Sequence, residues 1–127
     1  MREILFRGKR TDNGTWTCGY LFCIWERAYL CWGTTNSVPN MKEVLPETVC
    51  QFTGLYDKNS MKIFEGDIVE RGGRIWLVEY SNKYGQFMMT TYTEKGISWS
   101  RSFDLIPPDW CEVIGNIYDN PELLEGS

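Results

Sequence analysis

One stretch near the N-terminus decides which fold to expect, and it runs Thr15-Trp16-Thr17-Cys18-Gly19-Tyr20-Leu21-Phe22-Cys23-Ile24-Trp25. Polar and apolar residues alternate in its first half, and its second half is apolar at almost every position. Aromatic and β-branched side chains fit strands well, and successive side chains of a strand point to opposite faces. We therefore predict a strand in which one face carries Trp16, Cys18, Tyr20, Phe22 and Ile24.

Turn signals on both sides of this strand predict hairpins. Asp12-Asn13-Gly14 precedes it, and Asn-Gly favours the primed turns that close hairpins. Residues 1–9 are therefore expected to pair with residues 15–25. On the other side, Glu26-Arg27 is expected to turn the chain into a returning strand over residues 28–33.

The next two segments are expected to be less regular. Residues 34–40 are rich in Thr, Asn, Ser and Pro, a composition that predicts a loop. Residues 44–50 contain Pro46, which has no N–H group to donate to a sheet, so this stretch suits an edge or an irregular segment.

Beyond residue 50, short apolar stretches recur about every ten residues between turn signals such as 57–60 and 71–74. This spacing is typical of antiparallel sandwiches and small barrels. Asn120 followed by Pro121 is a helix-start signature, which predicts a short C-terminal helix. The predicted strands cover residues 51–56, 61–64, 68–70, 75–80, 86–92, 98–106 and 110–117.

The composition supports a mainly β protein. The 127 residues include one Ala, the best helix former, but 12 Gly and 19 aromatic residues. The apolar fraction of 43% and the net charge of -4 argue against disorder. The chain contains no His, which excludes chemistry that depends on histidine.

These observations predict a mainly β fold with two parts. An SH3-like small barrel is expected over residues 51–127, closed by the short C-terminal helix, and an N-terminal β extension is expected over residues 1–50. A small β domain needs bulky side chains to fill its interior. We therefore expect the aromatic residues to be core residues rather than a binding platform.

The cysteines and the N-terminal residues indicate in which cellular compartment the protein is expected. Five cysteines without a signal peptide argue against a disulfide framework, and the chain has no Cys-x-x-Cys pair of the kind that binds zinc. No run approaches the roughly 18 apolar residues that span a bilayer. We expect a cytoplasmic protein without membrane association, with buried cysteines and with no cofactor or metal.

Six segments of the chain form an ordered series, namely residues 1–9, 19–21, 46–49, 52–59, 64–69 and 112–124. In this order they resemble the YopX family, whose members belong to bacterial prophages, phages and mobile elements. The resemblance runs to about Leu124 and departs slightly at Ser60-Met61, where the family turn has Gly and a polar residue. It implies a mostly β protein with an SH3-type barrel and an N-terminal extension, and it carries over no catalytic residues.

Residues with catalytic or ligand-binding potential are few. Glu65 and Asp67 flank Gly66, and paired carboxylates can bind a divalent cation or act as acid and base. The alternative, which we favour, is a tight turn with solvated carboxylates. Residues 71–74, Arg-Gly-Gly-Arg, lack the Lys-Ser/Thr ending of a phosphate-binding loop and predict a hairpin turn. No nucleophile signature is present, so we expect no enzyme and no catalytic residues.

The distribution of charge is the most suggestive feature. Residues 1–10 have a net charge of +3, contributed by Arg2, Arg7, Lys9 and Arg10 against Glu3. Residues 103–127 have a net charge of -6 and contain no Lys or Arg. One interpretation is head-to-tail association into a homo-oligomer. The other is that the two ends lie beside each other in one subunit, or that both are solvated.

A second kind of partner is nucleic acid. Basic turns with nearby aromatic residues could contact phosphates and stack on bases. The residues concerned are Arg71, Arg74 and Lys83, together with Tyr80 and Tyr84. The acidic balance of the chain, with a pI near 4.8, argues against this hypothesis.

The sequence thus favours a non-enzymatic phage or prophage accessory protein that acts as a protein-binding or self-assembling module. The alternative is a module that associates with nucleic acid. The partner protein is not identified by the sequence. The candidate binding residues are Arg2, Arg7, Lys9, Arg10, Arg71, Arg74 and Lys83.

Overall fold

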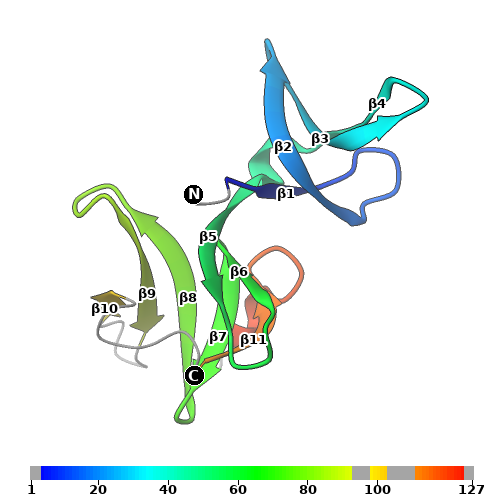
Figure 1. The fold of residues 1–127 in the computed structure, drawn as a ribbon. Coiled ribbons are helices and arrows are strands. Elements are labelled where there is room, and N and C mark those ends of the chain that lie inside the picture. The colour runs from blue at the N-terminus through cyan, green and yellow to red at the C-terminus, as the bar shows by residue number, and fades with distance from the viewer. Residues whose placement is uncertain (1–3, 93–97, 103–110, 125–127) are drawn as a thin grey trace. The chain divides into compact units, whose positions relative to one another are not determined.

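The structure is a computed structural model that describes residues 4–92, 98–102 and 111–124. As predicted, the fold is mainly β, with strands in two antiparallel sheets (Figure 1). The strands are Phe6–Lys9 (β1), Trp16–Ile24 (β2), Arg27–Thr35 (β3), Val38–Val44 (β4), Cys50–Tyr56 (β5), Lys62–Phe64 (β6), Asp67–Arg71 (β7), Arg74–Ser81 (β8), Gln86–Tyr92 (β9), Ser98–Ser102 (β10) and Glu112–Asn116 (β11). Two short 3-10 helices are Pro46–Thr48 (η1) and Pro121–Leu124 (η3).

The chain forms two compact units, Met1–Phe52 and Thr53–Ser127. The strand order of one sheet is β4-β3-β2-β1-β5-β6, and that of the other is β10-β9-β8-β7-β11. Strand β5 crosses the boundary between the units. Its residues Cys50 and Gln51 pair with β1, and it neighbours β6 in the sheet order.

The first unit is built from consecutive hairpins. Phe6 to Lys9 of β1 pair with Gly19 to Trp16 of β2, which confirms the predicted first hairpin. The predicted turn at Glu26-Arg27 is displaced by one residue, because Ile24 pairs with Arg27 and leaves Trp25-Glu26 as the two-residue turn. Trp25 occupies its first position with a φ of 54°.

The loop predicted over residues 34–40 is wrong, because this segment contains a third hairpin. Asn36 and Ser37 have φ values of 52° and 67°, as a primed two-residue turn requires, and Thr35 pairs with Val38 on either side of them. Pro39 is tolerated because β4 is an edge strand of its sheet. The composition indicated a break in regular structure here, but neither the two-residue turn nor the strands that flank it were predicted.

One face of the β1–β4 sheet covers the core of the first unit. This core consists of Ala28, Leu30 and Val44, with Phe6, Leu21 and Val49 packed against it. The sheet curves enough for Arg10, just after β1, to bridge Val44 at the end of β4. Gly19 allows a close approach, since a Cβ atom added there would lie 2.5 Å from the backbone oxygen of Cys31.

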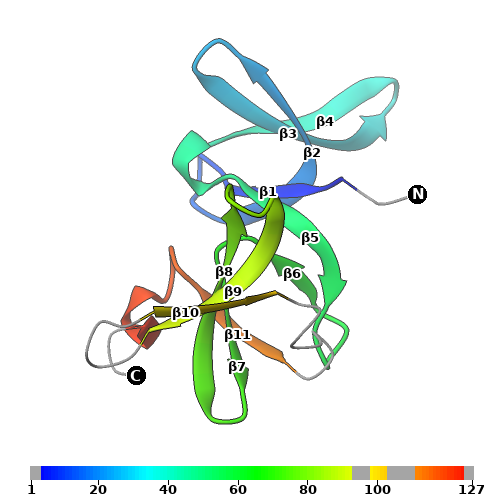
Figure 2. The same cartoon turned by 90° about the vertical axis from the view of Figure 1, so that its left-hand side faces the viewer.

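The second unit contains the larger core. Its buried residues come from β6 to β9 and from the residue before β11, and they are Ile63, Val69, Trp76, Val78, Met89 and Cys111. A two-residue turn at Gly72-Gly73, with φ values of 59° and 79°, connects β7 and β8 as predicted. Figure 2 shows that the β7–β8 turn and the β8–β9 turn lie at opposite ends of β8.

Two finer predictions of the fold are wrong. The described strands form two open sheets with distinct edge strands, so they do not form the closed SH3-like barrel that was expected. The short helix that was expected to close the barrel is only one turn of 3-10 helix, at residues 121–124. Of the strand predicted over residues 98–106, residues 98–102 form β10, and residues 103–106 lie outside the described part of the chain.

Candidate functional site

The face of the β2–β3 hairpin that points away from the core of the first unit carries large apolar side chains. Paired residues of antiparallel strands share a face, so Leu21 with Leu30 and Cys23 with Ala28 lie on the core side. The opposite face carries Tyr20, Phe22, Ile24, Trp25 and Tyr29, which we call the aromatic face.

Four of these side chains are exposed. The exposed fraction is 64% for Tyr20, 40% for Phe22, 47% for Ile24 and 97% for Trp25. Single apolar residues on a surface are common, but a contiguous group of them marks an interaction site in soluble proteins. The expectation that the aromatic residues are core residues is therefore wrong for this hairpin, although it holds for Phe52, Phe64 and Trp76, which are buried.

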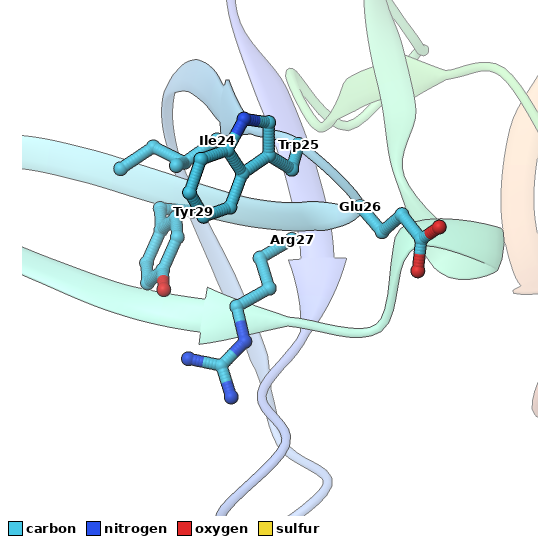
Figure 3. A pocket seen from close by; sticks show the side chains of 5 residues that line it. All are labelled: Ile24, Trp25, Glu26, Arg27 and Tyr29. Atoms are coloured by element: carbon cyan, nitrogen blue, oxygen red, sulfur yellow. The ribbon is translucent and has the colours of Figure 1, made fainter.

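Two rings of the aromatic face contact each other. Phe22 and Tyr29 lie opposite each other on β2 and β3, with ring centroids 5.2 Å apart and an angle of 24° between their planes. Ile24, Trp25, Glu26, Arg27 and Tyr29 line an open hollow of about 670 Å³ at the tip of the hairpin. Figure 3 shows Ile24, Trp25 and Tyr29 grouped on one side of the hairpin, while the carboxylate of Glu26 points away from them.

Trp25 holds a backbone conformation that is costly for its type of side chain. A φ of 54° lies in the left-handed region, which bulky residues rarely adopt and which Gly or Asn usually occupies in hairpin turns. Strained residues of this kind are concentrated at functional sites. Trp25 therefore combines unfavourable backbone geometry with an almost fully exposed indole.

Arg27 places one positive charge at the tip of the hairpin, beside Glu26. The Nε atom of Arg27 lies 3.6 Å from Oε2 of Glu43, and a hydrogen bond with Tyr29 together with this carboxylate raises the pKa of Arg27 above its ordinary value. Arg7 and Lys9 lie at the other end of β2, over the ring of Trp16 at 4.8 and 5.5 Å from its centroid. These contacts are cation–π interactions.

The candidate residues of the first unit have separate environments. Arg2 lies outside the described residues. Arg7 and Lys9 lie on β1 and contact Trp16. Arg10 donates two hydrogen bonds to Asp12, of 3.0 and 2.8 Å, which hold the pKa of Asp12 below its ordinary value.

The structure does not bring the candidate residues of the second unit together. Arg71 and Arg74 pair with each other across the β7–β8 turn. Lys83 lies beyond the other end of β8, where its Nζ atom is 5.2 Å from the centroid of the Tyr84 ring. Eight residues of strand separate the two turns, which corresponds to roughly 25 Å.

Asp67, one of the two carboxylates considered for chemistry, has a structural role. Asp67 is buried and its Oδ2 accepts a 2.8 Å hydrogen bond from the N–H of Phe64, while Gly66 has the φ of 86° that the turn requires. The predicted turn is confirmed, but the expectation that its carboxylates are solvated is wrong for Asp67, which is 1% exposed. Among the residues that the structure describes, no group of three His, Cys, Asp or Glu residues is placed to hold a metal ion.

Asp57 accepts three backbone hydrogen bonds. Its Oδ1 accepts hydrogen bonds from the N–H groups of Asn59 and Met61, at 2.8 and 2.9 Å, and its Oδ2 accepts one from Val113 at 2.9 Å. Burial of the carboxyl group raises its pKa, but these three donors outweigh burial and hold the pKa of Asp57 below 3.8. Asp57 thus ties the β5–β6 turn to β11.

The cysteines are all free, but the expectation that they are buried is only partly right. Cys50 and Cys111 are buried, Cys31 is half-buried, and Cys18 and Cys23 are exposed. In the described residues, no helix has the length and apolar character needed to cross a membrane.

Comparison with known proteins identifies the family. The family model described as YopX protein matches residues 6–125. The chain belongs to the YopX family. The structure is similar to the crystal structure of protein EF1440 from Enterococcus faecalis, with 21% identity and a TM-score of 0.57, covering 98% of this chain and 99% of that one. This similarity concerns the fold, and a comparison with curated proteins finds no match.

Sequence reasoning placed the candidate site on basic residues and missed the side chains at the tip of the hairpin. The two-residue period of β2 grouped Tyr20, Phe22 and Ile24 correctly on one face. The sequence feature that could have indicated the site is Trp25, a bulky residue in the turn beside the charged Glu26. Alternation along a strand indicates which residues share a face, but it does not indicate whether that face is covered.

Proposed function

We propose that this YopX-family chain is a non-enzymatic protein-binding module of a bacterial phage or prophage and that it binds its partner through the aromatic face. The observation that carries the proposal is the exposure of Tyr20, Phe22, Ile24 and Trp25 on one continuous face of β2 and its turn. The cytoplasmic location is part of the proposal, supported by five free cysteines.

The chemistry of the face suits protein recognition. Trp, Tyr and Arg contribute most of the binding energy in protein interfaces, because they bury large areas at low entropic cost. The tip of the hairpin provides all three types in Trp25, Tyr29 and Arg27 around one hollow. Phe22 and Tyr29 are held against each other before binding, which reduces the entropy lost on association.

Co-purification from bacterial cells that express the tagged full chain tests this proposal. We expect a protein partner in stoichiometric amount, and we expect Phe22→Ser or Trp25→Gly to reduce its recovery at least tenfold. Tyr84→Ser is the matched control, since Tyr84 is an aromatic residue with 59% exposure in the second unit. Equal recovery by all the variants would contradict the proposal.

Nucleic-acid binding is a second candidate, supported by one hollow in the second unit. Tyr80, Ser81, Lys83 and Tyr84 line it together with Glu79, Met88 and Thr90, and its volume is about 270 Å³. Exposed tyrosines beside a lysine could stack on bases and contact phosphate. A gel-shift assay with single- and double-stranded DNA and RNA tests this candidate. Binding should weaken steeply between about 50 and 200 mM salt, and the absence of a shift at low salt would eliminate it.

A further inference from the structure

The turn between β1 and β2 contains the pair Asn13-Gly14, which the proposed function does not use. Both residues are exposed. Gly14 has a φ of 73°, and among the described residues nothing beyond its chain neighbours lies within 4 Å of the position that a Cβ atom would take there. No side chain therefore shields the main-chain nitrogen of Gly14, which directly follows the side-chain amide of Asn13.

The side-chain oxygen of Asn13 accepts two hydrogen bonds from Thr15. The N–H of Thr15 donates to Oδ1 at 3.0 Å, and the Thr15 hydroxyl donates to the same atom at 2.7 Å. Two donors on one carbonyl oxygen withdraw electrons from its carbon and stabilise negative charge that develops on the oxygen. Because this oxygen faces Thr15, the NH2 group of the amide lies on the other side of Cγ, away from Thr15.

We propose that Asn13 is a site of spontaneous deamidation and that Thr15 promotes the reaction. The nitrogen of Gly14 loses its proton to hydroxide and attacks Cγ of Asn13, and the negative charge that forms on Oδ1 faces the two donors of Thr15. The bond between Cγ and the amide nitrogen then breaks, and the nitrogen leaves as ammonia after taking a proton from water. The product is a cyclic succinimide that joins residues 13 and 14.

Water completes the reaction at the succinimide. It adds to one of the two ring carbonyl carbons, and the bond from that carbon to the ring nitrogen breaks. Addition at Cγ gives an ordinary Asp, whereas addition at the main-chain carbonyl carbon routes the chain through the former side chain and gives isoAsp. Overall, one water is consumed and one ammonia is released, and nothing is oxidised or reduced.

The hydrogen bonds of the turn control access to this reaction. The N–H of Gly14 donates to the carbonyl oxygen of Arg10 at 3.0 Å, and the N–H of Arg10 donates to that of Thr15 at 2.9 Å. Attack requires the bond from Gly14 to open, which exposed turns do at low cost in free energy. The contact between Asn13 and Thr15 is local and does not depend on this bond.

Both products change the turn. Each adds a negative charge beside Asp12, which already accepts hydrogen bonds from Arg10 and whose Oδ2 lies 3.6 Å from Nζ of Lys42. The isoAsp form also adds one main-chain atom between residues 13 and 14, so the turn cannot keep both of its main-chain hydrogen bonds in their present geometry. The first unit should therefore lose stability as the isoAsp form accumulates. This inference is independent of the proposed function.

Peptide mapping by mass spectrometry tests the proposal on the purified full chain, incubated in water labelled with heavy oxygen. We expect Asn13 to convert at least about tenfold faster than Asn36 and Asn82, which are exposed turn residues followed by a residue with a side chain. The products should be Asp and isoAsp, with one heavy oxygen atom incorporated. The rate should rise with pH, because hydroxide removes the proton of Gly14.

Thr15→Val and Thr15→Ser form a matched pair that tests the role of Thr15. Thr15→Val keeps the N–H donor and removes the hydroxyl, so deamidation of Asn13 should slow by about two- to fivefold, the effect of one exposed neutral hydrogen bond. Thr15→Ser retains the hydroxyl and should retain the rate. Urea titration of both variants checks that the fold is intact, and the comparison of Asn13 with Asn36 and Asn82 in the unmodified chain does not depend on the variants.

Three results would overturn the inference. The first is conversion of Asn13 that is no faster than conversion of Asn36 and Asn82. The second is a product without heavy oxygen. The third is a rate for Thr15→Val that equals or exceeds the rate for Thr15→Ser, which would show that the hydroxyl does not promote the reaction.

Discussion

Phe22 and Tyr29 stack across the β2–β3 pair with their ring centroids 5.2 Å apart, on the face of the sheet that points away from the core. Two aromatic residues in this relationship would be expected inside a small β domain. Here they form the base of an exposed face that ends at Trp25, whose side chain is 97% exposed. The predictions below separate what this face contributes to folding from what it contributes to binding.

Trp25→Gly should stabilise the protein. Gly adopts a φ of 54° without steric cost, whereas other L-residues lose about 1–2 kcal/mol there. Because the indole is exposed, its removal takes little packing away. We expect the free energy of unfolding to rise by about 0.5–1 kcal/mol in urea titration. Ser37→Gly, at a φ of 67°, is the control, and it should stabilise by a similar amount without affecting association.

The opposite outcome for Trp25→Gly is informative. A loss of more than about 1 kcal/mol would show that the indole packs against the fold, which would remove the argument that its position serves binding.

Gly19→Ala should destabilise the first unit. The added Cβ atom would meet the backbone oxygen of Cys31 at 2.5 Å, and a backbone atom in a paired strand cannot move away easily. We expect a loss of about 2–4 kcal/mol in thermal or chemical denaturation. Gly14→Ala is the comparison, since nothing lies within 4 Å of that position and only its φ of 73° opposes the substitution. Equal losses for the two variants would rule out the close approach at Gly19.

Asp57→Asn should destabilise the second unit and change its response to acid. The folded protein lowers the pKa of Asp57 below 3.8, so this carboxylate stabilises the fold fully above that pH and loses its effect as the pH falls through the folded pKa. The variant should unfold more easily at pH 7, by about 1–3 kcal/mol, because an amide cannot accept all three N–H donors.

The pH dependence distinguishes this role from simple packing. Unfolding midpoints of Asp57→Asn and the unmodified protein, measured from about pH 7 down to about pH 2, should differ by a constant amount above about pH 4 and converge below it, as acid removes the advantage of the carboxylate. A constant difference across this range would contradict the assignment.

The strand-rich fold could be predicted because its signals are local. The alternation in residues 15–25 and the glycines at 72–73 each specify a nearby conformation, and the structure contains the strand and the turn that they indicate. The hairpin at Asn36-Ser37 was missed because neither residue is Gly, so its positive φ values have no strong signature in the sequence.

The sheet pairings and the site could not be predicted in the same way. The pairing of Arg7 with Cys50 joins residues far apart in the chain, and no local pattern specifies it. Whether a sheet stays open or closes into a barrel depends on whether its two edge strands pair with each other. The spacing of strands along the sequence indicates only how many strands form. Phe22 is 40% exposed because the described residues of the first unit do not cover its face, while the alternation of residues is the same for a covered and an uncovered face.

Photo-crosslinking from position 25 tests most directly whether the aromatic face binds protein. A photoreactive phenylalanine analogue would replace Trp25 in the full chain, and the same analogue at Arg74, an exposed turn position of the second unit, would serve as the control. We predict that irradiation of intact cells gives a protein adduct of discrete mass from position 25 and little from position 74. Equal or absent adduct formation at the two positions would contradict the assignment of the aromatic face as the binding site.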